Sequence, residues 1–121
     1  MTNKEVLEAY ESLIELSNRV TIPMPVSVTY AIARNKRILL PIVEDILNAR
    51  QDILRKYGIP IEENPGYFKP KPGCEQELTD AYNELNKIFN EISLYKISLN
   101  SLNGIELSIA DMDLLYFMVD G

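Results

Sequence analysis

Few side chains in this sequence are suited to chemistry, and histidine is missing altogether. Its absence removes the commonest general base, the commonest transition-metal ligand and every nucleophile that a histidine activates. The single cysteine, Cys74, lies near the expected start of a helix, where the helix dipole favours a thiolate. We interpret Cys74 as an incidental residue at a helix start rather than as a redox or nucleophilic thiol.

Acidic residues near the C-terminus offer the oxygen ligands that Mg²⁺ and Ca²⁺ prefer, with Asp111 and Asp113 close to Glu106 and Asp120. On a helix, however, side chains two positions apart point in different directions. Asp111 is better explained as the acid of a capping box that begins at Ser108. No glycine-rich phosphate loop is present. The sequence therefore predicts no metal, no cofactor and no enzymatic activity.

A cluster of basic side chains, Arg34, Lys36 and Arg37, falls within an apolar helical segment. One interpretation is an anion or phosphate contact, or an electrostatic dock for an acidic partner. The other is a solvated face opposite the apolar side of the helix. Arg34 can also pair within the fold, with Glu84 or Glu91.

Aromatic residues supply the other candidate contacts. Tyr67 and Phe68 lie in a proline-rich loop and are candidate interface anchors, because aromatic residues dominate binding hot spots. The alternative is that they fold back onto the helices. Tyr82 and Phe89 share the apolar face of a predicted helix, and we expect both in the core.

The composition is that of one globular domain over residues 1–121, with 46% hydrophobic and 25% charged residues. No apolar run approaches the roughly 18 residues of a membrane span, and the N-terminus lacks a signal-peptide pattern. The single cysteine excludes an internal disulfide and fits a reducing compartment. We therefore expect a cytoplasmic protein with no membrane partner.

The net charge of −6 is unevenly spread along the chain. Residues 1–60 hold 7 acidic and 8 basic residues (net +1), whereas residues 61–121 hold 11 and 4 (net −7). Overall acidity argues against a nucleic-acid partner, since such binding depends mainly on neutralised phosphates. The asymmetry permits the two halves to attract each other, and it equally permits the acidic half to meet a basic partner.

The segment over residues 25–57 is apolar at helical spacing and predicts one long helix, with Pro41 in its middle. Pro41 must kink or split this helix, because proline removes a backbone hydrogen bond and crowds the preceding turn. The apolar residues form two adjacent stripes: Ile32, Leu39, Ile42, Ile46, Ala49 and Ile53, and beside them Leu40, Val43, Leu47, Leu54 and Tyr57. So wide a face predicts packing against at least two neighbours.

The remaining elements are predicted from caps, turns and periodicity. A capping box at Thr2 and Glu5 starts a helix near residue 3, and a third helix covers residues 74–92. Residues 20–25 form an extended connector. Residues 92–99 and 105–107 form a hairpin, and a last helix spans residues 109–119. We predict a mainly α fold: a long central helix packed by two helices, with a small C-terminal β-hairpin and a short terminal helix.

Two sequence blocks resemble short uncharacterised proteins encoded by phages and prophages. The first, from Pro25 to Asn35, fits P-x-x-x-x-Y-A-I-x-x-N at the start of a long helix. The second combines I-x-L-Y-K-I-x-L with G-I-E-L-S-x-A-D-M near the C-terminus. The resemblance covers most of the chain, and its motifs are structural rather than chemical. It implies a phage or prophage origin and a bacterial host cytoplasm, and it supplies no catalytic or binding residue.

These observations favour a small non-enzymatic accessory protein that binds a host or phage protein. A second hypothesis is an oligomer that sequesters a small anionic ligand through Arg34, Lys36 and Arg37, and a third is a virion assembly factor. We also expect the chain to form a homodimer, because a wide apolar face is hard to cover within one small chain.

Overall fold

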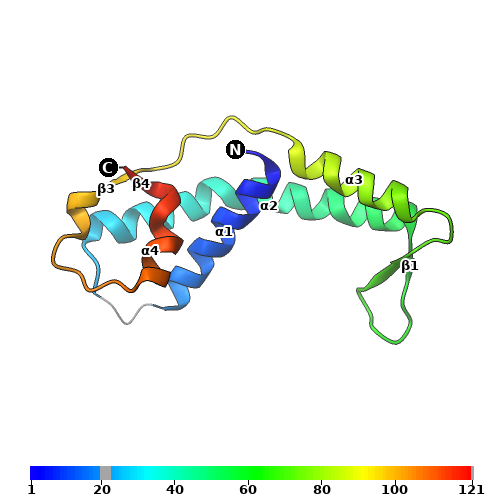
Figure 1. Cartoon of the computed structure of the whole chain (residues 1–121), viewed down its shortest axis with the longest axis horizontal. Helices are drawn as coiled ribbons and strands as arrows, with labels where there is room; N and C mark the ends of the chain where they lie inside the picture. Colours follow the sequence, from blue (N-terminus) through cyan, green and yellow to red (C-terminus); the bar gives the residue numbers. More distant parts are fainter. Residues whose placement is uncertain (20–22, 121) are drawn as a thin grey trace.

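The computed structural model describes residues 1–19 and 23–120. Figure 1 shows a long helix with the other elements arranged along it. In chain order the helices and strands are α1 (Asn3–Asn18), α2 (Val26–Tyr57), β1 (Gly58–Pro60), β2 (Phe68–Pro70), α3 (Glu75–Lys87), β3 (Ile97–Ser98), α4 (Ile109–Leu115) and β4 (Val119–Asp120). Two short 3₁₀ segments, Leu99–Leu102 and Tyr116–Met118, complete the fold. The predicted connector at 20–25 falls partly outside the described residues, and the described part of it carries no helix or strand.

Capping boxes start both α1 and α4, as predicted. At α1 the Thr2 hydroxyl accepts a hydrogen bond from the Glu5 amide (3.2 Å), and the Thr2 amide donates to the Glu5 carboxylate (2.9 Å). At α4 the Asp111 amide donates to the Ser108 hydroxyl (3.0 Å), and the Ser108 amide donates to the Asp111 carboxylate (3.3 Å). Each pair satisfies backbone donors that the first helical turn leaves free.

Helix α2 runs unbroken through Pro41, so the proline does not split it. Proline has no N–H to donate, which leaves the carbonyl of Arg37 without its usual helical partner. Pro41 and Arg37 are both exposed, so water can take the place of that partner. The helix ends at Gly58, where an added Cβ would lie 2.6 Å from the Leu54 carbonyl oxygen. That close approach requires glycine.

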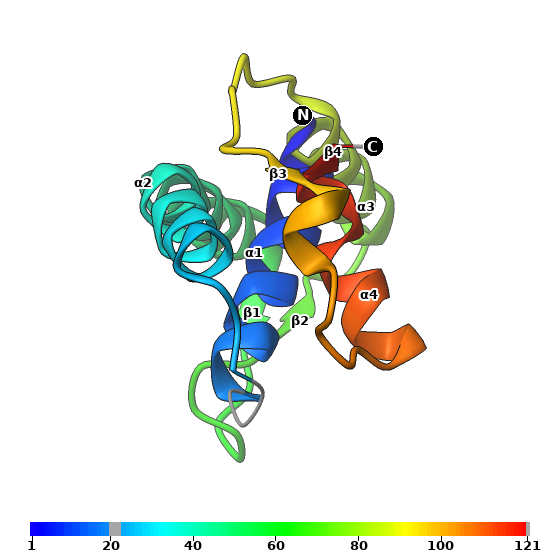
Figure 2. The same cartoon turned by 90° about the vertical axis from the view of Figure 1, so that its left-hand side faces the viewer.

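Helices α1 and α3 follow one another along α2, which is the predicted packing of a long helix by two shorter ones (Figure 1). In the end-on view of Figure 2, α2 lies at one edge of the molecule, with α1, α4 and the β3–β4 pair to one side of it. The side of α2 that faces them is buried, through Val28, Ala31, Ile32, Asn35, Leu39, Val43 and Ile46. Their apolar neighbours in the core include Val6, Leu13, Leu16, Leu115 and Met118.

Helix α3 ends at Lys87, earlier than the predicted residue 92, because the start of α1 takes up its last carbonyls. The Asn3 side chain donates to the carbonyl of Leu85 (2.7 Å), and the Asn3 amide donates to the carbonyl of Ile88 (2.9 Å). The chain beyond is extended, which turns Phe89 outward. Phe89 is 67% exposed, so its predicted place in the core is wrong, and Tyr82 is half-buried.

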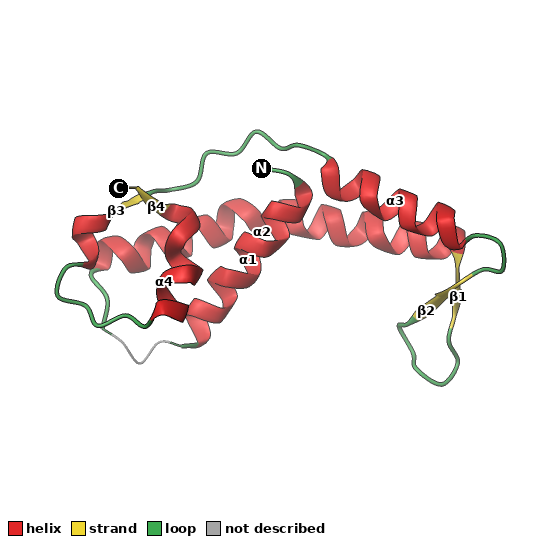
Figure 3. Ribbon diagram, in the orientation of Figure 1, coloured by secondary structure: helices red, strands yellow, loops and turns green. Residues whose placement is uncertain are grey.

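The predicted hairpin between residues 92–99 and 105–107 is also wrong. Strand β3 instead pairs in parallel with β4, with Ile97 opposite Val119. This pairing is possible because α4 ends at Leu115, before the predicted residue 119, and the chain that follows it lies beside β3. The hairpin of this fold is β1–β2, with Gly58 opposite Pro70 in antiparallel register. Figure 3 shows these two strand pairs at opposite ends of the molecule. The mainly helical fold class with small β elements is confirmed.

A buried amide attaches the C-terminal segment to α2. Asn35 is 0% exposed, its Nδ2 donates to the Tyr95 carbonyl (2.9 Å), and its Oδ1 accepts from the Tyr95 amide (2.6 Å). The rings of Tyr30 and Tyr95 also meet edge to face, with centroids 5.5 Å apart. Tyr30 and Asn35 belong to the first block that carries the phage-protein resemblance, and Tyr95 belongs to the second. The two blocks therefore contact each other in the fold.

Replacing Asn35 by alanine should lower the free energy of unfolding by about 2 kcal/mol, because it leaves both backbone groups of Tyr95 without their partner. Asn48→Ala, an exposed amide on the same helix, is the control and should change stability by less than about 0.5 kcal/mol. Urea unfolding measures both. Equal, small effects would contradict the structural role of Asn35.

Candidate functional site

The three predicted basic residues do not form one compact cluster. Successive helical residues are turned by about 100°, so Arg34 and Lys36 lie on opposite sides of the buried Asn35 ridge. Lys36 is half-buried and donates to the Ser17 hydroxyl of α1 (3.3 Å). Among the described residues, Arg34 forms no ion pair with Glu84 or Glu91, so that prediction is wrong.

Lys36 and Arg37 line a groove between α1 and α2. One part of it has a volume of about 270 Å³ and is lined by Tyr10, Ala33, Lys36, Arg37 and Leu40. A second part of about 200 Å³ shares Ala33 and Lys36 and extends past Ser17 to Met24 and Thr29. The groove is thus apolar with two cationic groups at its side, and Arg34 does not line it.

A regular row of apolar side chains runs along the exposed side of α2, next to this groove. The row, which we call the outer stripe, consists of residues spaced seven apart: Val26, Ala33, Leu40, Leu47 and Leu54. Val26 is 82% exposed, Leu40 41% and Leu47 47%. Ala33 is also exposed, and Leu54 is half-buried. In Figure 2 this helix forms the edge of the molecule, and the other labelled elements lie to one side of it.

The second apolar stripe predicted for α2 is only partly buried. Of its residues, Val43 lies in the core, whereas Leu40 and Leu47 are exposed and belong to the outer stripe. The first stripe is buried at Ile32, Leu39 and Ile46 only. Sequence periodicity therefore predicted a wide apolar face, and the fold covers only the part that α1, α3 and the C-terminal elements reach.

The β1–β2 hairpin carries the predicted aromatic anchors, at the end of the molecule remote from α4 (Figure 1). Tyr67 is 69% exposed, and its amide donates to the Asn64 carbonyl (3.1 Å) across a turn with Gly66 at φ 89°. Phe68 is half-buried opposite Pro60. The two neighbouring residues therefore differ in exposure, and neither lies near the groove that Lys36 and Arg37 line.

A wider hollow of about 580 Å³ lies between α2 and α3, lined in part by Asp52, Lys56 and Glu84. It is shallow, since α3 contributes no buried residue to the fold. Its charged groups carry both signs, and Asp52 already pairs with Arg55 (3.4 Å). The charged side chains that line this hollow therefore do not form a site for one kind of ligand.

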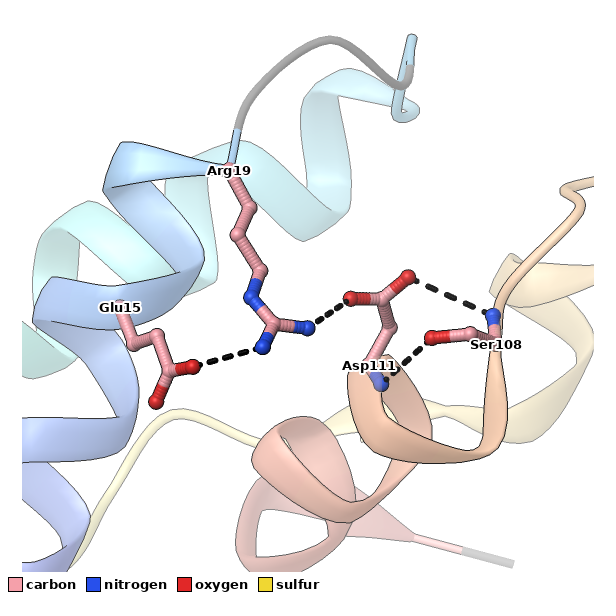
Figure 4. A network of polar contacts seen from close by, with 4 residues as sticks. All are labelled: Glu15, Arg19, Ser108 and Asp111. Atoms are coloured by element: carbon pink, nitrogen blue, oxygen red, sulfur yellow. Dashed lines mark hydrogen bonds and ion pairs between the residues drawn. The ribbon is translucent and has the colours of Figure 1, made fainter.

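The strongest polar network joins the end of α1 to the start of α4 (Figure 4). Arg19 donates to the Asp111 carboxylate (2.9 Å) and to the Glu15 carboxylate (2.7 Å). The hydrogen bond from Arg19, aided by Ser108, lowers the pKa of Asp111, and the same contact raises the pKa of Arg19. The capping role of Asp111 is confirmed, whereas its pairing with Arg19, 92 residues away in sequence, left no local signal. All four groups are engaged in holding the fold.

The chain matches no protein-family model, and no curated protein or solved structure is significantly similar to it. The resemblance to short phage proteins therefore stays a prediction. Within the described residues, no helix has the length and apolarity needed to cross a bilayer.

Because its pKa is lowered in the folded state, Asp111 should stabilise the fold above about pH 3.9, where a free aspartate titrates, and less as acid protonates it. Asp111→Asn keeps an oxygen for the cap but removes the charge that Arg19 meets. The stability difference between wild type and Asp111→Asn should be largest at neutral pH and shrink below about pH 3.9.

The matched control is Asp113→Asn, which removes an exposed carboxylate of the same helix. Urea unfolding over a pH series measures all three proteins. A wild-type advantage that persists unchanged into acid would contradict the ion-pair assignment.

Proposed function

We propose that this protein is a non-enzymatic protein–protein interaction module and that the outer stripe of α2 is its docking surface. The observation that carries the proposal is the exposure of Leu40 (41%) and Leu47 (47%) on a regular helical row that the chain itself covers only in part. The resemblance to short phage proteins supports a phage or prophage origin, with a host or phage protein as the partner.

The outer stripe has the geometry of a helix-binding surface. Apolar residues seven apart stay on one side of a helix, and they supply one of the two apolar positions that each heptad has in the seam between two packed helices. From Val26 to Leu54 the stripe spans ~42 Å, at ~1.5 Å rise per residue. Exposed apolar residues that gather along one side of a helix mark interaction sites more often than singly scattered ones do.

The polar groups support a binding role rather than catalysis. Among the described residues, the buried polar or charged ones are Asn3, Asn35 and Asp111, and each is hydrogen-bonded to another part of the fold. Asn3 and Asn35 carry amides, which do not act as a general acid or base. The carboxylate of Asp111 is engaged by Arg19 and Ser108.

An alternative function is the sequestration of a small anion in the groove between α1 and α2. Lys36 and Arg37 support it, because they line the same hollow as Tyr10. Against it, Lys36 already donates to Ser17, and the hollow opens directly onto the outer stripe at Ala33 and Leu40. We favour a protein partner, for which the cations would flank the apolar contact.

The proposal is tested by affinity capture from a bacterial lysate with wild type and with the double variant Leu40→Asp, Leu47→Asp. A protein partner should be captured reproducibly by wild type and at least about tenfold less by the variant, because charges would be buried at the contact. The control is Ile109→Asp, Tyr116→Asp, which places the same charges on exposed apolar positions of another region.

Native mass spectrometry of the same eluates separates the two hypotheses. A small anionic mass retained by wild type, with no captured protein, would contradict the proposed function and favour sequestration. Equal capture by wild type and the Leu40, Leu47 variant would place the docking surface elsewhere.

A further inference from the structure

We propose that the outer stripe binds the outer stripe of a second copy of this chain, in an antiparallel, two-fold symmetric pair of α2 helices centred on Leu40. The inference rests on the proposed function, because it names the partner of the same surface. Three properties of α2 support this pairing: the symmetry of the stripe, the charges beside it and its open position in the molecule.

The stripe is self-complementary about Leu40. If two copies of α2 run in opposite directions with Leu40 beside Leu40, residues the same distance before and after position 40 come level. Ala33 then meets Leu47 of the second copy, and Val26 meets Leu54 of the second copy. On either side of the central Leu40 pair a larger side chain faces a smaller one, which favours close packing of the two helices.

Charges beside the stripe favour the same pairing. Arg37 lies three residues before Leu40 and Glu44 four residues after it, and both are exposed on the same side of the stripe. In the antiparallel pair Arg37 comes within about one residue, ~1.5 Å along the axis, of Glu44 of the second copy. The two-fold axis repeats this contact, so that two opposite-charge pairs flank the central leucines.

A parallel pair is disfavoured by the same residues. Its two-fold axis would run along the helices and place Arg37 and Glu44 of the two copies on opposite sides of the seam, so neither opposite-charge pair would form. It would also leave a gap at the two Ala33 residues. Neither Arg37 nor Glu44 forms an ion pair with another of the described residues, so both are available to a partner.

The position of α2 leaves room for a second helix. In Figure 2, α1, α4 and the β3–β4 pair lie to one side of α2, and the outer stripe is on the exposed part of the helix. A strict spacing of seven residues drifts by about 20° per repeat on a straight helix. Two such helices therefore wrap around each other with a left-handed twist, as in a short antiparallel coiled coil.

Disulfide cross-linking tests the pairing and its direction. In a Cys74→Ser background, which removes the only native thiol, Ala33→Cys and Leu47→Cys are made in chains with tags of different size. Diamide oxidises two adjacent thiols to one disulfide, taking up the two electrons and two protons that they release. The mixture should give the mixed covalent dimer at least about tenfold above the homodimer of either variant, because only unlike positions meet.

Each other outcome overturns the inference. Efficient cross-linking of Ala33→Cys with itself would mean a parallel pair. No cross-linking in the mixture, with Leu40→Cys also failing to cross-link, would mean that the stripe does not bind a second copy. Folding of every variant is checked by circular dichroism, and Asn48→Cys, on the same helix outside the stripe, is the control for random collision.

Charge reversal provides a second measurement that needs no cysteine. Arg37→Glu and Glu44→Arg should each weaken the dimer by at least about tenfold, because each single reversal sets like charges against each other. The double variant should restore the dimer, since the exchanged side chains again meet with opposite charges across the pair. Light scattering over a concentration series measures the dissociation constant. Additive weakening in the double variant would contradict the antiparallel register.

The two proposals fail in different ways. If wild type is monomeric at every concentration but captures a lysate protein through Leu40 and Leu47, self-pairing is wrong and the proposed function stands. If wild type neither dimerises nor captures a protein through this surface, both are wrong.

Discussion

The fold depends on the way that α2 is packed, because the rest of the chain covers this long helix on one side only. The helix runs from Val26 to Tyr57, and the chain packs α1, α3 and the C-terminal elements against only part of its circumference. Burial of apolar surface drives this packing, and it is nearly complete at Leu39 and Ile46, whereas Leu40 stays 41% exposed and Leu47 47% exposed. The same helix therefore serves as the core of the fold on one side and presents an apolar row on the other.

Three buried polar residues fix the shorter elements in place around this helix. Asn35 holds the Tyr95 segment, Asn3 joins the start of α1 to the end of α3, and Asp111 ties α4 to Arg19. A buried polar group without partners is costly, so each of these contacts selects one arrangement of the segments that it joins. The polar chemistry of the interior thus specifies the fold, which leaves binding to the exposed surface.

Local signals account for the parts of the fold that the sequence predicted. The capping boxes at Thr2 and Ser108 and the periodicity of residues 25–57 depend on neighbours within one or two turns. The pairing of Ile97 with Val119 and the outward turn of Phe89 depend on contacts between distant segments, which no local pattern records. The same limit applies to the site: Lys36 and Arg37 were candidates by charge, whereas the exposure of Leu40 required knowing where α1 and α3 end.

Hydroxyl-radical footprinting of the unmodified chain, read by mass spectrometry at low and high protein concentration, tests the two-sided character of α2 most directly. Leu39 and Val43 should be protected at both concentrations, because the fold buries them. Leu40 and Leu47 should react at low concentration and become protected at high concentration, as a second copy covers them. Equal reactivity of Leu40 and Leu47 at both concentrations would contradict the account, as would reactive Leu39 and Val43.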